Sequence, residues 1–357
     1  MDISNKIAFQ PAVFQDITLK LGVIDNFNWG WNHIENKEKK YLKELRDIAT
    51  IESVGSSTRI EGATLSDEEV KRLLKSVQIS KLDNREEQEV VGYYEALKLI
   101  LDHHKDIDLS ERYLHQLHFV LLKYSSKDQR QRGQFKNLSN KVVANYPDGE
   151  QKVIFRTTEP HLTAVEMNNL ILWTNEQLEK KRLHPILTIS VFVYEFLSIH
   201  PYQDGNGRLS RLLTTFLLLK HNYYFIEYLS LEHIIEKRKH IYYLVLMETQ
   251  KDRGTPNEIL DRWVVFFLEC LIDLSEKLKT KYNIYNSLKS STNDRQKKVL
   301  NYIHKNKTIQ IKDLEENLCD YSRNTLKKDL QYLVREGFIL TTGSGRGVCY
   351  HAKDQNL

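Results

Sequence analysis

Hydrophobic residues recur at three- and four-residue spacing through most of the chain, the spacing of one face of an α-helix. The clearest segments of this kind are 109–122, 162–178 and 260–278. Ser66-Asp-Glu-Glu69 matches a capping box and predicts the start of another helix. Pro185–Ile199 and the residues after Arg211 are apolar on nearly every face and are expected to be core helices. The pattern therefore predicts a mainly α fold.

Residues 140–155 interrupt the helical pattern. Two β-prone segments, Lys141–Tyr146 and Gln151–Phe155, flank Pro147-Asp148-Gly149, which is typical of a turn. These residues predict an antiparallel hairpin. Such a hairpin is either an ordinary surface feature or a binding element, because an exposed strand edge can pair with an extended peptide.

The C-terminal part changes character after 287–294, a polar stretch expected to be a linker between domains. The elements predicted after it are helices over 295–305 and 312–318 with a β-prone 308–311 between them, a helix capped by Ser322 and ended by Gly337, and strands over 338–342 and 348–351. This order resembles a winged helix-turn-helix. We expect three domains, namely an N-terminal helical region (1–105), a central domain (106–286), and the linker with the winged helix (287–357).

Charge is concentrated in the winged helix. Residues 294–353 contain twelve Lys/Arg and seven Asp/Glu, a net charge of +5, whereas the whole chain of 357 residues carries +4. The side chains expected to meet double-stranded DNA are Arg323, Lys327, Lys328 and Arg346. The alternative is that this module docks a protein or forms a dimer.

Composition narrows the class of protein. The chain has no apolar run of about 18 residues and no apolar signal core near Met1, so neither a membrane span nor secretion is indicated. Its three cysteines fit neither a zinc spacing nor a disulfide framework, which suits a reducing cytoplasm. We expect a cytoplasmic protein with no membrane partner. The sequence leaves the oligomeric state open, a homodimer included.

The most informative stretch is His200-Pro-Tyr-Gln-Asp-Gly-Asn-Gly-Arg-Leu-Ser-Arg211, which lies between the two predicted core helices. Gly205 and Gly207 can take positive φ and let backbone N–H groups converge on an anion at a helix start. Two arginines three apart could hold neighbouring phosphoryl oxygens. A carboxylate can bind Mg²⁺, and a neutral histidine can take a proton from a hydroxyl. The stretch predicts nucleotidyl or phosphoryl transfer to an alcohol.

These residues resemble the signature of the Fic family, His-x-Phe-x-Asp/Glu-Gly-Asn-Gly-Arg-x-x-Arg. Only Tyr202 departs from it, and its hydroxyl needs a partner. The resemblance implies a Fic-type helical bundle in which the hairpin is a flap that registers a target segment. It also implies the transfer of AMP from ATP to a Ser, Thr or Tyr hydroxyl of a target protein, with release of pyrophosphate.

The resemblance assigns a role to each matching residue. It implies that His200 is the general base and that Asp204 holds Mg²⁺ on the phosphates. The residues that it implies for nucleotide binding are Gly205, Asn206, Gly207, Arg208 and Arg211, with Arg211 on the γ-phosphate.

A second string, Ser57-Thr58-Arg59-Ile60-Glu61-Gly62, resembles the inhibitory helix motif of self-restrained Fic proteins. Ser57 and Glu61 are four apart and share a helix face. The resemblance implies that Glu61 occupies Arg211 and so blocks productive binding of ATP. Alternatively, Thr58-x-x-Glu61 is a capping box and Glu61 belongs to a helix start.

The sequence thus predicts a self-inhibited protein adenylyltransferase that uses ATP and Mg²⁺. One set of alternatives keeps the same site with other chemistry, namely phosphotransfer, another nucleotide, or removal of AMP from proteins. Another alternative is a DNA-binding transcription regulator whose Fic-like domain senses a nucleotide.

Overall fold

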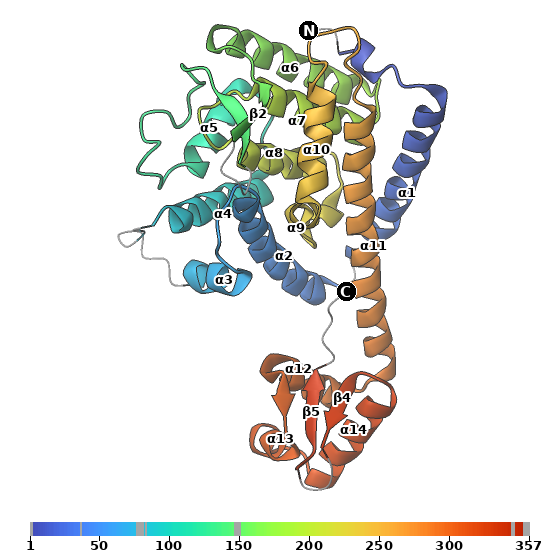
Figure 1. Cartoon of the computed structure of the whole chain (residues 1–357). Coiled ribbons are helices and arrows are strands. Elements are labelled where there is room, and N and C mark those ends of the chain that lie inside the picture. The colour runs from blue at the N-terminus through green and yellow to red at the C-terminus, as the bar shows by residue number, and fades with distance from the viewer. Residues whose placement is uncertain are drawn as a thin grey trace. The chain divides into compact units, whose positions relative to one another are not determined.

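The computed structural model describes residues 3–35, 38–75, 82, 84–145, 151–343 and 347–352. The chain forms two units, Met1–Glu276 and Lys277–Leu357. Figure 1 shows the elements of each unit.

The first unit is built mainly from helices, which confirms the predicted fold class (Figure 1). In chain order they are η1 (Asn5–Ile7), α1 (Pro11–Glu35), α2 (Lys39–Ile60), α3 (Asp67–Lys75), α4 (Arg85–His103), α5 (Glu111–Leu121), α6 (Pro160–Lys180), α7 (Pro185–Ile199), α8 (Asn206–Lys220), η3 (Tyr224–Glu227), α9 (Leu231–Lys237), α10 (Lys239–Gln250) and the start of α11 (Asp261–Ser291). The capping box at Ser66 is present, because Ser66 and Glu69 bond reciprocally ahead of α3. None of the described helices is both long and apolar enough to span a membrane.

The two core helices form the centre of this unit. Every residue of α7 from Ile186 to Ile199 is buried, and α8 is buried from Arg208 to Leu219. The helix α7 packs on α6 and α8, while α8 also packs on α4 and α5. The chain passes from α7 to α8 through residues 200–205, so the loop of the histidine motif is fixed at both ends by buried helices.

The predicted hairpin is present. Strand β1 (Lys141–Asn145) pairs antiparallel with β2 (Gln151–Arg156), and the register shifts between Val142 and Val143, where β2 has one extra residue. The predicted turn at Pro147-Asp148-Gly149 lies outside the described residues.

The helix α2 decides between the two interpretations of Glu61. Glu61 is the C-cap residue of α2, not a residue of its first turn. The Thr58 hydroxyl donates back to the carbonyls of Val54 and Gly55. The capping-box interpretation is therefore wrong, since a capping box belongs to a helix N-terminus. Gly62 follows with a φ of 108°, a conformation that L side chains rarely adopt.

The second unit has the predicted order of helices and hairpin. Its elements are α12 (Asp294–Asn306), β3 (Thr308–Ile309), α13 (Ile311–Asn317), α14 (Arg323–Arg335), β4 (Ile339–Thr342) and β5 (Cys349–Ala352). The sheet has the order β3-β5-β4. A core of its own runs from Val299 to Ile339. Ser322 caps α14 by accepting a hydrogen bond from the Thr325 N–H, as predicted.

The expected linker over 287–294 is mostly helical. The helix α11 continues to Ser291, and α12 begins at Asp294 behind a capping box formed by Asn293 and Gln296. Only two residues separate the helices. The linker prediction was wrong here because the stretch is polar but contains neither glycine nor proline, so composition alone does not end the helix.

Candidate functional site

The loop after α7 folds back on itself. The Asn206 Oδ1 accepts a hydrogen bond from the Tyr202 N–H at 2.9 Å, and the Asn206 Nδ2 donates to the Tyr202 carbonyl at 2.7 Å. His200 has a φ of 54°, which is uncommon for a residue with a side chain, and Gly205 has a φ of 80°. The buried Asn206 side chain thus shapes the loop through its amide group.

His200 lies at the C-terminal end of α7. Its Nδ1 is 3.1 Å from the Leu197 carbonyl oxygen. Because a carbonyl only accepts, we assign the hydrogen to Nδ1 and the lone pair to Nε2. Burial, with a smaller contribution from the Lys136 ammonium, lowers the pKa of His200 to about 4, although the Leu197 carbonyl and the charges of Glu61 and Asp204 oppose this shift. The imidazole is therefore neutral at pH 7, the form that a general base requires.

The start of α8 provides backbone donors. The N–H groups of the first helical turn have no partner within the helix, and the helix dipole favours an anion there. Gly205 is the N-cap residue in the left-handed conformation, as predicted. Gly207 does not take positive φ, so that expectation was wrong. A Cβ at position 207 would lie 2.2 Å from the Glu61 Oε1, so this glycine provides space.

Asp204 and Arg208 contact two residues of α4. The Arg208 Nη1 lies 3.1 Å from the Glu89 Oε2, and its Nη2 lies 3.4 Å from the Asp204 Oδ1. The Arg85 Nη2 donates to the Asp204 Oδ2 at 3.1 Å. Burial would raise the pKa of Asp204, but Arg208, the Gly205 N–H and Arg85 lower it overall. Arg85 and Glu89 were missed by sequence reasoning, because no motif spacing links α4 to the loop.

Arg211 is held by the end of α2. Its Nε donates to the Ser57 Oγ at 2.8 Å, and its Nη2 donates to the Ser57 carbonyl at 2.9 Å and to the Glu61 Oε1 at 2.8 Å. Burial acts to lower the pKa of Arg211, but the charge of Glu61, its hydrogen bond and the nearby Tyr242 and Tyr93 together outweigh burial and raise the pKa. The structure therefore brings Ser57, Glu61 and Arg211 together.

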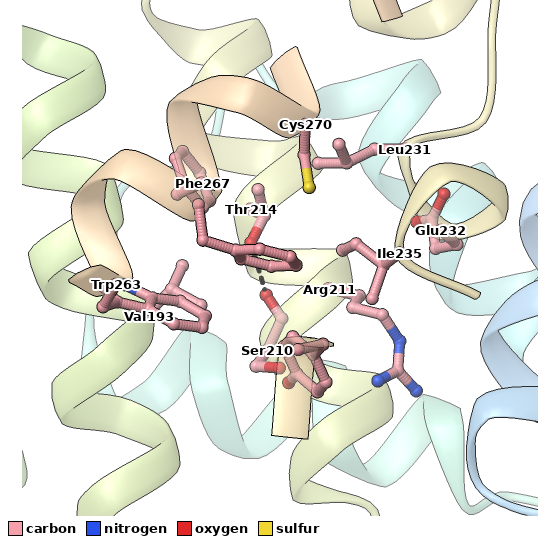
Figure 2. Close-up of a pocket in the computed structure, with 12 residues that line it drawn as sticks. Val193, Ser210, Arg211, Thr214, Leu231, Glu232, Ile235, Trp263, Phe267 and Cys270 are labelled. Carbon is pink, nitrogen blue, oxygen red and sulfur yellow. Dashed lines mark hydrogen bonds between the residues drawn. The ribbon is translucent and has the colours of Figure 1, made fainter. Parts of the chain in front are cut away.

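An apolar pocket lies beside Arg211 (Figure 2). Val193, Leu231, Ile235, Trp263 and Phe267 are among the side chains that line it with Arg211. Its cavity volume is about 20 Å³, enough for a single water molecule and far too small for a nucleotide.

The Tyr202 hydroxyl has a hydrogen-bond partner, as expected from the sequence. It lies 3.1 Å from the His115 Nδ1, and the Tyr202 ring stacks on His118 with centroids 3.8 Å apart. The His118 Nδ1 accepts from the Gly133 N–H at 2.9 Å, and its Nε2 lies 3.0 Å from the Asp204 carbonyl oxygen. Burial lowers the pKa of His118 to about 4. A neutral His118 on α5 thus supports the loop from below.

Known proteins share this combination of motif and fold. Residues 108–218 match the Fic/DOC family, and residues 295–349 match the DeoR-like helix-turn-helix domain. The chain contains a Fic domain. The family match covers the helices α5 to α8 with the hairpin and the loop of His200, whereas Glu61 and α4 lie outside the matched residues.

The Fic domain has relatives of modest similarity. The Protein adenylyltransferase Fic of Drosophila melanogaster is 27% identical over 184 residues, which are 51% of this chain and 35% of that protein. The Protein adenylyltransferase Fic of Aedes aegypti is 27% identical over 187 residues, with 51% of this chain and 34% of that protein covered. The chain thus spans about a third of the length of these relatives.

Solved structures share the fold. A Fic domain containing signaling protein from Bacteroides thetaiotaomicron superposes with a TM-score of 0.59 at 24% identity, covering 72% of this chain and 95% of that one. A Fic family protein from Desulfovibrio desulfuricans gives a TM-score of 0.61 at 22% identity, with 99% of each chain covered. At these identities the likeness establishes the fold of the Fic domain alone.

The groups around the Fic loop fit a magnesium nucleotide. Among the described residues, the buried Arg208 Nε has no hydrogen-bond partner, so the site retains an unsatisfied cationic donor. No cluster of three or more His, Cys, Asp or Glu side chains forms a metal cage in the described part of the chain. Mg²⁺ in nucleotide sites is typically held by one or two carboxylates, with phosphate oxygens and water completing the shell. Asp204 is a suitable single carboxylate.

Three of the four DNA-binding candidates, Arg323, Lys327 and Lys328, lie on α14 of the second unit. Lys327 and Lys328 are exposed on α14. Arg323 is also exposed, but its guanidinium pairs with Glu315 on α13. Arg346 lies outside the described residues. The exposed face of α14 also carries Asn324, Gln331 and Arg335, which sequence reasoning did not single out.

Proposed function

We propose that the chain is a protein adenylyltransferase that transfers AMP from ATP to a Ser, Thr or Tyr hydroxyl of a target protein and is restrained by Glu61. The observation that carries this proposal is the neutral His200 beside an anion-binding helix start whose two arginines lie on α8. The adenylyltransferase names of the relatives support the choice of reaction.

In this mechanism the His200 Nε2 removes the proton of the target hydroxyl while its oxygen attacks the α-phosphorus. The bond to the bridging oxygen breaks, and pyrophosphate leaves. Arg208 and the backbone donors at the start of α8 hold the phosphates by charge-assisted bonds. Asp204 is the proposed ligand of Mg²⁺, which neutralises phosphate charge when bound. Asn206 acts through the loop conformation that its amide fixes.

Restraint follows from the contacts of Arg211. Three hydrogen bonds to Ser57 and Glu61 use donors that a γ-phosphate needs. A carboxylate and a phosphate cannot share that guanidinium without like-charge repulsion. Glu61→Gly removes the charged competitor, so we predict that this variant transfers more AMP than the parent, with self-modification as the readout.

The test compares ATP labelled on the α-phosphate with ATP labelled on the γ-phosphate, each with Mg²⁺. The Glu61→Gly variant is expected to take label from α-ATP and not from γ-ATP. The double variant Glu61→Gly, His200→Ala is expected to lose the label while it still binds ATP. Label from γ-ATP alone would identify phosphoryl transfer. Equal labelling of the parent and Glu61→Gly would contradict the restraint.

The second unit supports a second candidate function, DNA binding. The observation that favours it is the exposed polar and basic face of α14 in a unit that matches a DeoR-like helix-turn-helix domain. Lysines that contact phosphates release counterions, so the logarithm of the affinity falls linearly with the logarithm of the salt concentration.

We predict that Lys327→Ala and Lys328→Ala each reduce the steepness of this salt dependence, the slope of log affinity against log salt concentration, by about one. The affinity for a duplex DNA probe is measured by fluorescence anisotropy. Lys305→Ala, an exposed lysine on α12, is the matched control and should leave the slope unchanged. If all three variants keep the slope of the parent, α14 is excluded as the contact surface. A DNA affinity that changes with ATP, without any label transfer, would favour the nucleotide sensor over the transferase.

A further inference from the structure

Lys136 is a buried lysine between α5 and β1. The residue is only 4% exposed. Its Nζ donates to the Thr157 Oγ1 at 2.8 Å, to the Asn140 Oδ1 at 2.9 Å and to the Ile199 carbonyl at 3.1 Å. These three bonds match the three donors of an ammonium group. All three acceptors are neutral, and none of the carboxylates in the described residues forms an ion pair with Lys136.

The same residue binds both sides of His200. The Lys136 Nζ holds the carbonyl of Ile199, and the Lys136 backbone N–H donates to the carbonyl of Pro201 at 2.8 Å. His200 between them has a φ of 54°. A non-glycine residue persists in this conformation when its surroundings fix it. The two bonds from Lys136 fix the carbonyl groups on either side of His200.

The other bonds of Lys136 reach the base of the hairpin. Asn140 immediately precedes β1, and Thr157 immediately follows β2. The Asn140 Nδ2 also donates to the Tyr202 carbonyl at 2.9 Å. One ammonium group therefore connects the two ends of the hairpin with the loop that carries His200.

We propose that Lys136 is a positioning residue that holds His200 and the base of the hairpin in one register, so that a hydroxyl bound along the hairpin meets the imidazole. This inference rests on the proposed role of His200 as the base. The charge of Lys136 acts in the same direction, because it disfavours the imidazolium form of His200. Burial lowers the pKa of Lys136 to about 8, with Glu159 and Glu166 opposing this shift and Arg253 adding to it.

The experiment compares Lys136→Met and Lys136→Arg in the Glu61→Gly background. The first readout is the titration of His200 by NMR with ¹⁵N-labelled histidine, assigned through His200→Ala. Lys136→Met is expected to raise the pKa of His200, whereas Lys136→Arg keeps the charge and is expected to leave it low. The second readout is label transfer. Its kcat should fall about ten- to a hundredfold in Lys136→Met, because small misplacement of a reacting group has effects of this size.

The KM for ATP should change by less than about twofold, because the residues proposed to bind ATP lie on α8 and in its loop. Lys98→Met, which removes an exposed lysine of α4, is the control and should match the Glu61→Gly reference. An unchanged His200 titration together with unchanged kcat in folded Lys136→Met would overturn the proposal.

If Lys136→Met does not fold, Lys136→Arg decides. Its guanidinium places the hydrogen-bond donors at other positions than the ammonium does, so kcat should still fall, and an unaltered kcat would overturn the proposal. If the reference transfers no label, the proposed function fails, and the His200 titration still tests Lys136.

Discussion

At the residue scale, Arg211 shows why the proposed restraint has two parts. Ser57 lies one helical turn before Glu61, and its hydroxyl and carbonyl orient the Arg211 guanidinium. Only the Glu61 carboxylate adds charge. Glu61 comes close because Gly207 has no side chain, since a Cβ there would lie 2.2 Å from the Glu61 Oε1. One glycine thus permits the contact between the two motifs.

This geometry predicts that the effect of Gly207→Ala on the free energy of unfolding differs between the parent and the Glu61→Gly background. In the parent, the added methyl group should displace the Glu61 carboxylate and lower the free energy of unfolding by about 1 to 3 kcal/mol, the range for a lost hydrogen bond to a charged group. In the Glu61→Gly background nothing is displaced, and alanine should be neutral or should stabilise α8 by up to about 1 kcal/mol. Urea unfolding followed by tryptophan fluorescence measures both effects. Equal effects in the two backgrounds would show that position 207 does not report on Glu61.

At the element scale, Arg59 makes several of the contacts that hold the end of α2. The Arg59 Nε and Nη2 bind the two carboxylate oxygens of Glu236 on α9 at 2.7 and 3.0 Å. Its Nη1 lies 2.9 Å from the Asp67 Oδ1 and donates to the Leu65 carbonyl at 2.9 Å. Arg59 therefore joins the last turn of α2 to α9 and to the start of α3, two residues before Glu61.

We predict that Glu236→Gln loosens this turn and raises label transfer about two- to fivefold above the parent, but less than Glu61→Gly does. The expected size of this rise follows from the strength of a partly buried ion pair, about 1 kcal/mol. That energy corresponds to about a fivefold change in the population of the form in which Glu61 pairs with Arg211. Initial rates with α-labelled ATP check it. Glu248→Gln on α10, whose partner is Arg262, is the matched control and should leave the rate unchanged. No rise in Glu236→Gln would mean that Arg59 does not set the position of Glu61.

The elements also show where prediction from the sequence ends. The helices, the hairpin and the loop of His200 follow from periodicity and turn chemistry, because these signals are local. Lys136, His118 and Arg85 contact the loop from parts of the chain far from it in sequence, and such contacts leave no spacing pattern. The same holds for Glu89, which contacts Arg208 at the start of α8. The helical end of α11 was mistaken for a linker because its composition is polar while its backbone remains regular.

At the scale of the whole molecule, the two units have separate cores and separate candidate functions. The core of the second unit consists of residues between Val299 and Ile339. The Fic loop, Glu61 and Lys136 all lie in the first unit. The chain's four tryptophans, at positions 29, 31, 173 and 263, are in the first unit as well, so their fluorescence reports on that unit alone.

Buried ion pairs connect Lys6, near the N-terminus, to residues far along the chain in the first unit. The Lys6 Nζ binds the Glu195 Oε1 at 2.6 Å and the Glu258 Oε1 at 3.0 Å, and both carboxylates are fully buried. Lys6→Met leaves two buried carboxylates with Arg253 as their remaining cation, so it should lower the unfolding free energy of the first unit by about 3 to 5 kcal/mol. Urea unfolding followed by tryptophan fluorescence measures this loss. Lys180→Met removes an exposed pair with Glu176 and should change the unfolding free energy by less than about 1 kcal/mol.

NMR signals of the second unit's core, between Val299 and Ile339, should disappear at the same urea concentration in the parent, Lys6→Met and Lys180→Met, because Lys6 belongs to the other unit. A shift of that transition in Lys6→Met would show that the two units unfold together.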